Sequence, residues 1–268
     1  MKYKNIFDTH THSNHSFDGN DSCKELCESL MLKGGIGIAI TDHCDIDGDD
    51  DFDTFANNQY DDTSAVKEEY CGQITLLQGI ELGQGIYQKD KALKIINSHD
   101  YDIIIGSIHN LDGMEDFYFL DYKKYDIDSL LTKYFENELE LAQWNKTDTL
   151  AHLTYPLRYI VEREGVCVDL SKYNDIIDAI FNTLIRNDKA LEVNTSGLFM
   201  AIDSTLPGID LIKRYHDMGG RLITVGSDSH YKEKICQGIS QGYDILKECG
   251  YKEFTVFKNR IPYQMPIE

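Results

Sequence analysis

The sequence predicts an α/β fold in which about seven parallel strands close, or nearly close, into a barrel. Three observations predict it. Seven short runs are almost continuously apolar and often β-branched, as in parallel strands that are covered on both faces. Helix-like segments alternate with these runs. Each run stops abruptly at polar residues, and a barrel accounts for this because its functional site lies at the carboxyl ends of the strands.

The predicted strands are followed along the chain by residues that can carry chemistry. They lie at residues 5–7, 35–40, 74–80, 101–108, 147–151, 190–193 and 221–226. In the same order they end at His10 and His12, Thr41-Asp42-His43, Glu81, His109, His152, Asn194-Thr195-Ser196, and Ser227-Asp228-Ser229-His230. The carboxyl-end rim of the barrel is therefore the predicted site.

Helical spacing of apolar residues predicts the segments that cover the strands. The clearest are residues 21–33, 128–146, 170–186 and 209–218. Leu26 and Leu30 lie on one face of the first segment, which Gly34-Gly35 ends, and Gly219-Gly220 ends the last. No linker rich in Gly, Ser or Pro interrupts the series, so residues 1–268 are predicted to form a single domain.

Composition restricts the class of protein. With 26 Lys and Arg against 46 Asp and Glu, the formal net charge is −20, which argues against nucleic acid as a partner. No apolar run approaches the roughly 18 residues that would cross a membrane. Residues 1–5 lack the apolar region of a signal peptide, and the seven scattered cysteines favour reduced thiols. We expect a cytoplasmic protein and leave open a homo-oligomer.

The stretch FDTHTHSNHSFDG, residues 7–19, gathers a third of the nine histidines. A cluster of imidazoles is costly to bury without partners, so it is either a solvated loop or a cation site. Imidazole nitrogens mixed with carboxylate oxygens favour Zn²⁺, Mn²⁺ or Fe²⁺ over Mg²⁺ or Ca²⁺. The candidate ligands at the rim are His10, His12, Asp18, His43, Glu81, His109, His152, Asp228 and His230. Nine are too many for one ion, and three ions with shared carboxylates would use them all.

Two acidic features near these ligands have open interpretations. Residues 45–53 are rich in Asp, but an EF-hand loop that began at Asp45 would need Gly at its sixth position and Glu at its twelfth, where this chain has Asp50 and Ala56. A solvated acidic loop, which could act as a lid, is the favoured interpretation. Asp8 could orient one of the histidines or be a simple carboxylate in the first strand.

The motifs at the strand ends resemble those of the PHP (polymerase and histidinol phosphatase) domain, and within it the histidinol-phosphate phosphatases. They are His10-x-His12, Asp18-Gly19, Thr41-Asp42-His43, Gly79-Ile80-Glu81, Ser107-Ile108-His109-Asn110, Ala151-His152 and Asp228-x-His230. The resemblance runs from about Tyr3 to Cys249. It implies a distorted (β/α)7, TIM-like barrel with two or three divalent metal ions at the carboxyl-end rim.

The resemblance also implies how the ligands divide. His10, His12, Glu81 and Asp228 would surround one ion, Glu81, His109 and His152 a second, and Asp18, His43 and His230 a third. The Glu81 carboxylate would bridge the first two ions. His15 falls at a variable position of the family pattern, so Asp18 is preferred as a ligand and His15 is a candidate for substrate contact.

The implied reaction is hydrolysis of L-histidinol phosphate to L-histidinol and phosphate, by attack of a metal-bound hydroxide without a phosphoenzyme. Arg158 matches an Arg of the phosphatase subgroup and suits a phosphate because its guanidinium binds oxygens in pairs. Asp228 and His230 are the other candidate catalytic residues, and Asn194 and Ser196 are candidates for substrate binding. The chain departs from the pattern after Gly197, where Leu198-Phe199-Met200 stands in place of a basic residue.

Two other functions are compatible with the sequence. A PHP phosphoesterase for another small phosphate ester, a nucleotide or a short oligonucleotide would need a basic, aromatic groove, and the scarcity of Arg argues against an oligonucleotide. A regulatory metal-binding module without catalysis would be indicated by missing ligands, and none is missing.

Overall fold

Seven parallel strands form the centre of the computed structural model, which describes residues 2–46 and 52–268. The strands follow one another in the sheet in their order along the chain. They are β1 (Phe7–Thr11), β2 (Gly37–Asp45), β3 (Thr75–Gly83), β4 (Ile103–Ser107), β5 (Thr149–Leu150), β6 (Ala190–Asn194) and β7 (Ile223–Gly226). All seven strands that the sequence predicts are present.

The barrel is nearly closed because the chain after β7 pairs with β1. The Asp228 amide donates to the His10 carbonyl at 2.9 Å, and the His12 amide donates to the Ser229 carbonyl at 2.9 Å. A parallel bridge joins Thr11 to Ser229. The barrel is irregular, since β5 has only two residues. This confirms the predicted distorted (β/α)7 barrel.

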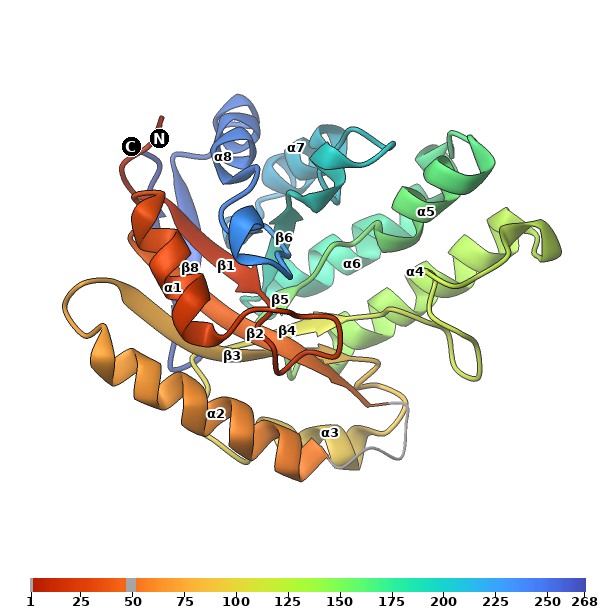
Figure 1. Ribbon diagram of the computed structural model, residues 1–268. Helices are drawn as coiled ribbons and strands as arrows, with labels where there is room; N and C mark the ends of the chain where they lie inside the picture. The colour runs from red at the N-terminus through yellow and green to blue at the C-terminus, as the bar shows by residue number, and fades with distance from the viewer. Residues whose placement is uncertain (1, 47–51) are drawn as a thin grey trace.

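Eight α-helices lie around the outside of the strands in the described parts of the chain (Figure 1). They are α1 (Cys23–Leu32), α2 (Phe52–Glu69), α3 (Lys89–Ile96), α4 (Ile127–Trp144), α5 (Tyr155–Glu164), α6 (Asn174–Arg186), α7 (Ile209–Asp217) and α8 (Ile239–Glu248). The four predicted helical segments correspond to α1, α4, α6 and α7. A capping box between Ser22 and Glu25 fixes the start of α1, and Leu26 and Leu30 are buried as its spacing predicts.

Strands β2 and β3 are longer than the sequence predicts. The prediction ended them at residues 40 and 80, before His43 and Glu81, but both residues are part of the strands and pair in register. The ladder continues because backbone hydrogen bonds do not depend on apolar side chains. The side chains of His43 and Glu81 line the cavity instead of the core.

The structure contains a hairpin that the sequence analysis did not identify. It is formed by β8 (Glu253–Lys258) and β9 (Ile261–Pro266). Its turn lies at the amino ends of β4 and β5, where the Asn259 amide donates to Asp102 at 3.1 Å and Arg260 Nε lies 2.5 Å from Asp148 Oδ2. The hairpin therefore closes the end of the barrel opposite the predicted site. The chain termini lie together (Figure 1), with the Lys4 amide donating to the Glu268 carbonyl.

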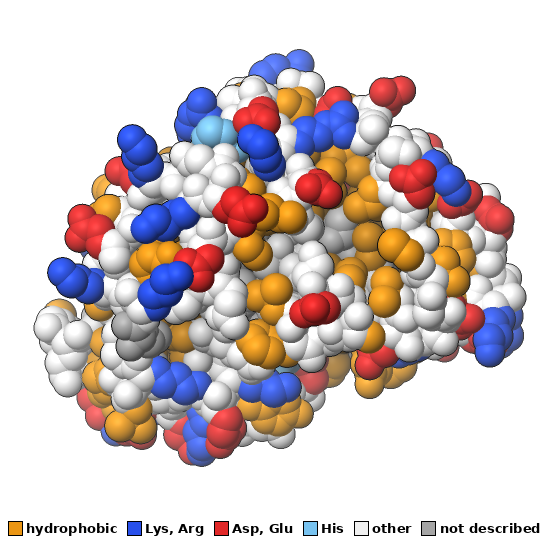
Figure 2. Space-filling view, turned by 90° about the horizontal axis from the view of Figure 1, so that it is seen from above, with side chains coloured by type: hydrophobic (Ala, Val, Ile, Leu, Met, Phe, Trp, Pro, Cys, Tyr) orange, Lys and Arg blue, Asp and Glu red, His pale blue; other side chains and the backbone are white. Residues whose placement is uncertain are grey.

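The predictions from composition concern surface charge, membrane-spanning segments and the state of the cysteines. On the face shown in Figure 2, Lys and Arg side chains are interspersed with Asp and Glu. Within the described residues no helix combines the length and the apolar character needed to cross a membrane. All seven cysteines are free thiols. Most of the predicted acidic loop, residues 47–51, lies outside the described residues.

Candidate metal centre and active site

A cavity of about 650 Å³ opens at the carboxyl ends of the strands. Its wall includes seven of the nine predicted ligands: Asp18, His43, Glu81, His109, His152, Asp228 and His230. The other two, His10 and His12, are fully buried beside them on β1 and just after it. The barrel therefore brings together all nine residues, which are separated by up to 220 positions in the chain.

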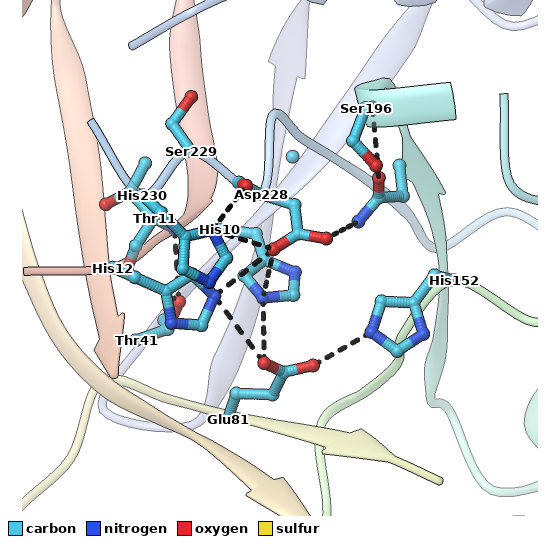
Figure 3. A network of polar contacts seen from close by, with 12 residues as sticks. His10, Thr11, His12, Thr41, Glu81, His152, Ser196, Asp228, Ser229 and His230 are labelled. Atoms are coloured by element: carbon cyan, nitrogen blue, oxygen red, sulfur yellow. Dashed lines mark hydrogen bonds and ion pairs between the residues drawn. The ribbon is translucent and has the colours of Figure 1, made fainter. Parts of the chain in front are cut away.

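Glu81 occupies the middle of this cluster, and its two carboxylate oxygens face different histidines. Oε2 lies 3.3 Å from His10 Nε2 and 3.5 Å from His12 Nε2. Oε1 lies 2.9 Å from His152 Nε2 and 3.1 Å from His109 Nε2. Figure 3 shows the side chain pointing toward the rings of His10, His12 and His152. This is the arrangement expected of a carboxylate that bridges two ions.

Asp228 faces His12 with one oxygen and Asn194 with the other (Figure 3). Oδ1 lies 3.3 Å from His12 Nε2 and 3.9 Å from His10 Nε2. Oδ2 accepts from Asn194 Nδ2 at 3.2 Å and from Arg158 at 3.4 Å. Asp228 thus connects the predicted first ion to the arginine that is the candidate phosphate ligand.

The third predicted group lies nearest the surface. Asp18 Oδ1 is 3.7 Å from His43 Nε2, and its Oδ2 is 3.3 Å from His230 Nε2. The two imidazole nitrogens are 3.3 Å apart. His43 also reaches inward, with its Nδ1 2.9 Å from Glu81 Oε2. His43 is therefore placed to serve either the third group or the Glu81 group.

Among the described residues, several buried polar atoms of the cluster have no hydrogen bond, although some of them lie at ion-pair distance from Glu81. They are His10 Nε2, His12 Nε2, His43 Nδ1, Glu81 Oε2 and His152 Nδ1. Three sets have ligand atoms that all lie within 4.8 Å of one another: His12, His43 and His230; His10, His12 and Glu81; and His43, Glu81 and His109. Buried polar groups without hydrogen bonds are costly, and a cation would satisfy most of these. The residues therefore fit divalent metal ions.

Electrostatics favour the ionised form of the central carboxylate. Burial by itself would raise the pKa of Glu81, but the nearby imidazoles of His10 and His109 outweigh burial and hold that pKa well below its usual value. Asp228 shows the same balance, with burial opposed chiefly by His10, and its pKa is also held well below its usual value. Both carboxylates are thus available as anionic ligands.

Two carboxylates that sequence analysis did not assign to the site hold the second ring nitrogen of two histidines. Glu192, fully buried on β6, lies 2.7 Å from His10 Nδ1 and accepts from the His152 amide at 2.8 Å. Asp45, at the end of β2, lies 3.3 Å from His109 Nδ1. These contacts leave Nε2 of His10 and His109 facing Glu81. The sequence contains one signal for the role of Glu192, because it is a Glu within the otherwise apolar strand ALEVN. A buried carboxylate needs a polar partner, so such a residue indicates a contact with another polar group.

Asp8, which was considered as a partner for a histidine, instead fixes the loop after β7. It accepts from the Ser227 amide at 2.8 Å, from the Ser227 hydroxyl at 2.6 Å and from the Cys236 amide at 2.8 Å. The loop that it holds carries Asp228 and His230. Its contribution to the site is therefore made through the backbone of that loop.

Arg158 projects from α5 into the cavity wall. Its guanidinium lies 4.3 Å from the ring centroid of Tyr155 and 5.0 Å from that of Tyr159, and it donates to the Ser196 hydroxyl at 3.0 Å. Asn194 is fully buried beneath Ser196 and accepts from the Ser196 amide and hydroxyl. The predicted substrate residues Arg158 and Ser196 therefore line the cavity, and Asn194 supports them.

His15 lies elsewhere. Its Nε2 is 3.2 Å from Asp62 Oδ2 on α2, and His15 is not among the residues that line the cavity. Asp18, three residues later, occupies the position beside His43 and His230. The preference for Asp18 over His15 near the ligands agrees with this placement.

Comparison with known proteins gives the family. The PHP domain model matches residues 8–196 of the chain. The chain belongs to the PHP domain family. Two bacterial relatives bear the name "Probable histidinol-phosphatase". The one from Clostridium acetobutylicum is 28% identical over 263 residues, 96% of this chain and 99% of the relative. The one from Thermotoga maritima is 29% identical over 251 residues, 94% of this chain and 95% of the relative.

A solved structure supports the architecture of this PHP domain. Histidinol phosphate phosphatase from Lactococcus lactis, crystallised with zinc, L-histidinol and phosphate, matches with a TM-score of 0.83 and 21% sequence identity. The match covers 96% of this chain and 98% of that chain. The two proteins therefore share the fold.

Proposed function

We propose that this PHP protein is a metal-dependent phosphomonoesterase that hydrolyses L-histidinol phosphate to L-histidinol and phosphate. The observation that carries the proposal is one cavity onto which both the imidazole–carboxylate cluster and the Arg158 guanidinium face. Relatives named histidinol-phosphatase, similar over more than nine tenths of the chain, support the choice of substrate. We further propose that residues 1–268 act as one domain in the cytoplasm, which the free thiols favour.

Two or three ions of Zn²⁺, Mn²⁺ or Fe²⁺ fit the donor set. His10, His12 and Asp228 would hold one, His109 and His152 a second, and Asp18, His43 and His230 a third, with Glu81 shared between the first two. Such ions lower the pKa of bound water and neutralise charge on phosphate oxygens. The ring contacts of Glu192 and Asp45 keep His10 and His109 turned toward Glu81.

Protein side chains would bind and orient the phosphoryl group. Arg158 would bind two of its oxygens, since its flat guanidinium packs against the rings of Tyr155 and Tyr159 and is turned toward Ser196 and Asp228. Asn194 positions Ser196 and Asp228 for this contact. Asp228 and His230 stay in the proposal as catalytic residues at the cavity surface. We propose no substrate contact for His15.

The cavity favours a small phosphate ester over a nucleic acid. Among the described residues that line it, Arg158 and Lys234 are the Lys or Arg side chains. Phe199 and Met200, at the departure from the family pattern, add apolar surface to the same wall. Two cations suit one phosphate group, whereas a polynucleotide needs a basic track.

The test is release of inorganic phosphate by purified protein from a panel that contains L-histidinol phosphate, a nucleoside monophosphate and a sugar phosphate. Metal content is measured on the same sample. We expect preferential hydrolysis of L-histidinol phosphate with two or three ions per chain. Glu81→Gln is the matched inactive control. Preferential hydrolysis of another ester by the metal-loaded protein would contradict the proposed substrate.

A further inference from the structure

Three buried polar residues beside the cluster have no part in the proposed metal site. Ser13 and Ser16 lie in the loop after β1, and Asp42 lies on β2 directly before His43. All three side chains are almost fully removed from water. A buried polar group is costly unless its hydrogen bonds are made, so the partners of each of these side chains can be counted.

Asp42 accepts hydrogen bonds from both serines. Its Oδ1 accepts from the Ser13 amide at 2.6 Å and from the Ser16 hydroxyl at 2.8 Å. Its Oδ2 accepts from the Ser13 hydroxyl at 2.9 Å. A carboxylate that accepts in this way has no proton to donate. The proton of the Ser16 hydroxyl is therefore directed at Asp42.

The oxygen of Ser16 also contacts two other groups. The backbone amide of His43 donates to it at 3.0 Å, and Nδ1 of His12 lies 3.1 Å from it. A serine hydroxyl has one proton to donate and two lone pairs that can accept. The proton is directed at Asp42, and the His43 amide takes one lone pair. His12 Nδ1 must therefore carry a proton and donate it to the second lone pair.

This assignment determines the state of the other nitrogen of the His12 ring. In a neutral imidazole with a proton on Nδ1, Nε2 carries only a lone pair. His12 Nε2 faces the cluster, 3.3 Å from Asp228 Oδ1 and 3.5 Å from Glu81 Oε2, and among the described residues it has no hydrogen bond. A lone pair that faces two carboxylates needs a cation between them. The Nδ1-protonated tautomer is the one that metal binding through Nε2 requires.

We propose that Ser16, oriented by Asp42, is a positioning residue that holds His12 in its Nδ1-protonated tautomer and so makes Nε2 the metal-binding atom. The inference rests on the proposed function, because it concerns the same metal site. A carboxylate, that of Glu192, faces Nδ1 of His10. At His12 a neutral hydroxyl takes this place, and Asp42 acts on the ring only through the direction of the Ser16 hydrogen bond.

The test uses zinc-loaded protein with isotope-labelled histidines. Hydrogen–nitrogen correlation spectra of the imidazole rings report which nitrogen of each ring carries a proton, and nuclear Overhauser contacts with residue 16 assign the His12 ring. In the unsubstituted protein we expect a proton on His12 Nδ1 that exchanges slowly with water. In Ser16→Ala this proton loses its acceptor. Its exchange should become faster, and Zn²⁺ affinity should fall roughly tenfold to a hundredfold.

Ser13→Ala is the matched control, since it removes a hydroxyl bonded to Asp42 but leaves the contact between Ser16 and His12. The signal of the Nδ1 proton and the Zn²⁺ affinity should stay nearly unchanged in this variant, and circular dichroism checks the fold of both variants. Equal losses in the two variants, or a proton on Nε2 of His12 in the zinc-loaded unsubstituted protein, would overturn the inference alone and reduce Ser16 to an anchor of its loop. If the unsubstituted protein bound no Zn²⁺, Mn²⁺ or Fe²⁺, the proposed function would fail and the inference with it.

Discussion

At the scale of the residue, the orientation of the proposed ligands depends on groups that contact them from outside the cluster. Glu192 makes two such contacts, since it lies 2.7 Å from His10 Nδ1 and accepts from the backbone amide of His152. Asn194 Nδ2 also donates to Glu192, at 3.3 Å. A carboxylate at this position fixes the orientation of the His10 ring and increases its basicity as a ligand.

Glu192→Gln should lower metal affinity by roughly tenfold to a hundredfold. The amide nitrogen would face either His10 Nδ1 or the His152 amide, both of which donate to the carboxylate in the native protein. Titration of metal-free protein with Zn²⁺ measures the change, and circular dichroism checks the fold. Glu253→Gln, at an exposed position of β8, is the matched control. Unaltered affinity in Glu192→Gln would contradict a role for Glu192 in holding the ligands.

Arg158 gives a prediction that separates phosphate recognition from metal binding. In Arg158→Ala, kcat/KM should fall roughly tenfold to a hundredfold, the value of a charge-assisted hydrogen bond of about 1.5–3 kcal/mol. Arg158→Lys should recover little, because an ammonium cannot reproduce the flat guanidinium that packs against two tyrosine rings. Metal content should be unchanged, since Asn194 still holds Asp228. Steady-state kinetics and elemental analysis decide this, and an unchanged kcat/KM would remove Arg158 from the site.

At the scale of the element, the helices contribute more than a cover for the strands. Helix α5 starts three residues after His152 and carries Tyr155, Arg158 and Tyr159 into the cavity wall. Pro156 in its first turn has the backbone angle that a helix start requires. Helix α4 instead carries an unusual acidic group: Glu138 is fully buried, and the hydroxyl of Tyr134, one turn earlier on the same helix, offsets the effect of burial on its pKa only in part.

Burial raises the pKa of Glu138 from 4.5 to about 8. The unfolded chain releases this proton near pH 4.5 and the folded protein only near pH 8, so stability falls as pH rises through this window. At about 1.4 kcal/mol per pKa unit, the loss has an upper limit of about 5 kcal/mol. Glu138→Gln should therefore match the unsubstituted protein in Tm at pH 5 and exceed it increasingly toward pH 9. Thermal unfolding at several pH values measures this, and a pH-independent difference would contradict it.

At the scale of the whole molecule, the two ends of the barrel have different roles, one in the proposed chemistry and the other in stability. The carboxyl-end rim gathers the proposed ligands, and the β8–β9 hairpin closes the amino end through Asn259 and Arg260. Arg260 meets Asp148, whose side chain is almost fully buried and also bonds the Ile104 amide. Stability and chemistry are thus built at opposite ends of the same strands, as in other α/β barrels.

Arg260→Ala should destabilise the protein by about 1.5–3 kcal/mol, since it leaves the buried Asp148 with weaker compensation. Tm should fall by several degrees. The kcat/KM value for L-histidinol phosphate should stay the same at temperatures well below unfolding, because the hairpin turn lies at the end remote from the ligands. Calorimetry and kinetics on one preparation test both parts. A large loss of kcat/KM in a folded variant would show that the two ends are coupled.

The sequence by itself determined the barrel, its seven strands and the nine candidate ligands. Apolar runs report burial of both sheet faces, and the polar residues that end them, such as His109 and His152, lie at one rim because parallel strands share a direction. The motif His10-x-His12 places two imidazoles close together through local geometry alone. These signals are local in the chain, so they could be read without coordinates.

Only the tertiary structure decided which groups hold the ligands and what faces the cavity. Glu192 was read as part of an apolar strand, and its contact with His10 joins residues 182 positions apart. The extension of β2 and β3 through His43 and Glu81 depends on backbone hydrogen bonds between the strands. The pattern of apolar and polar side chains does not report these bonds. The partners of Asp8 and of the β8–β9 turn likewise come from distant segments. Such contacts depend on how the barrel closes in space. The periodicity of side chains along the sequence does not specify which distant residues meet.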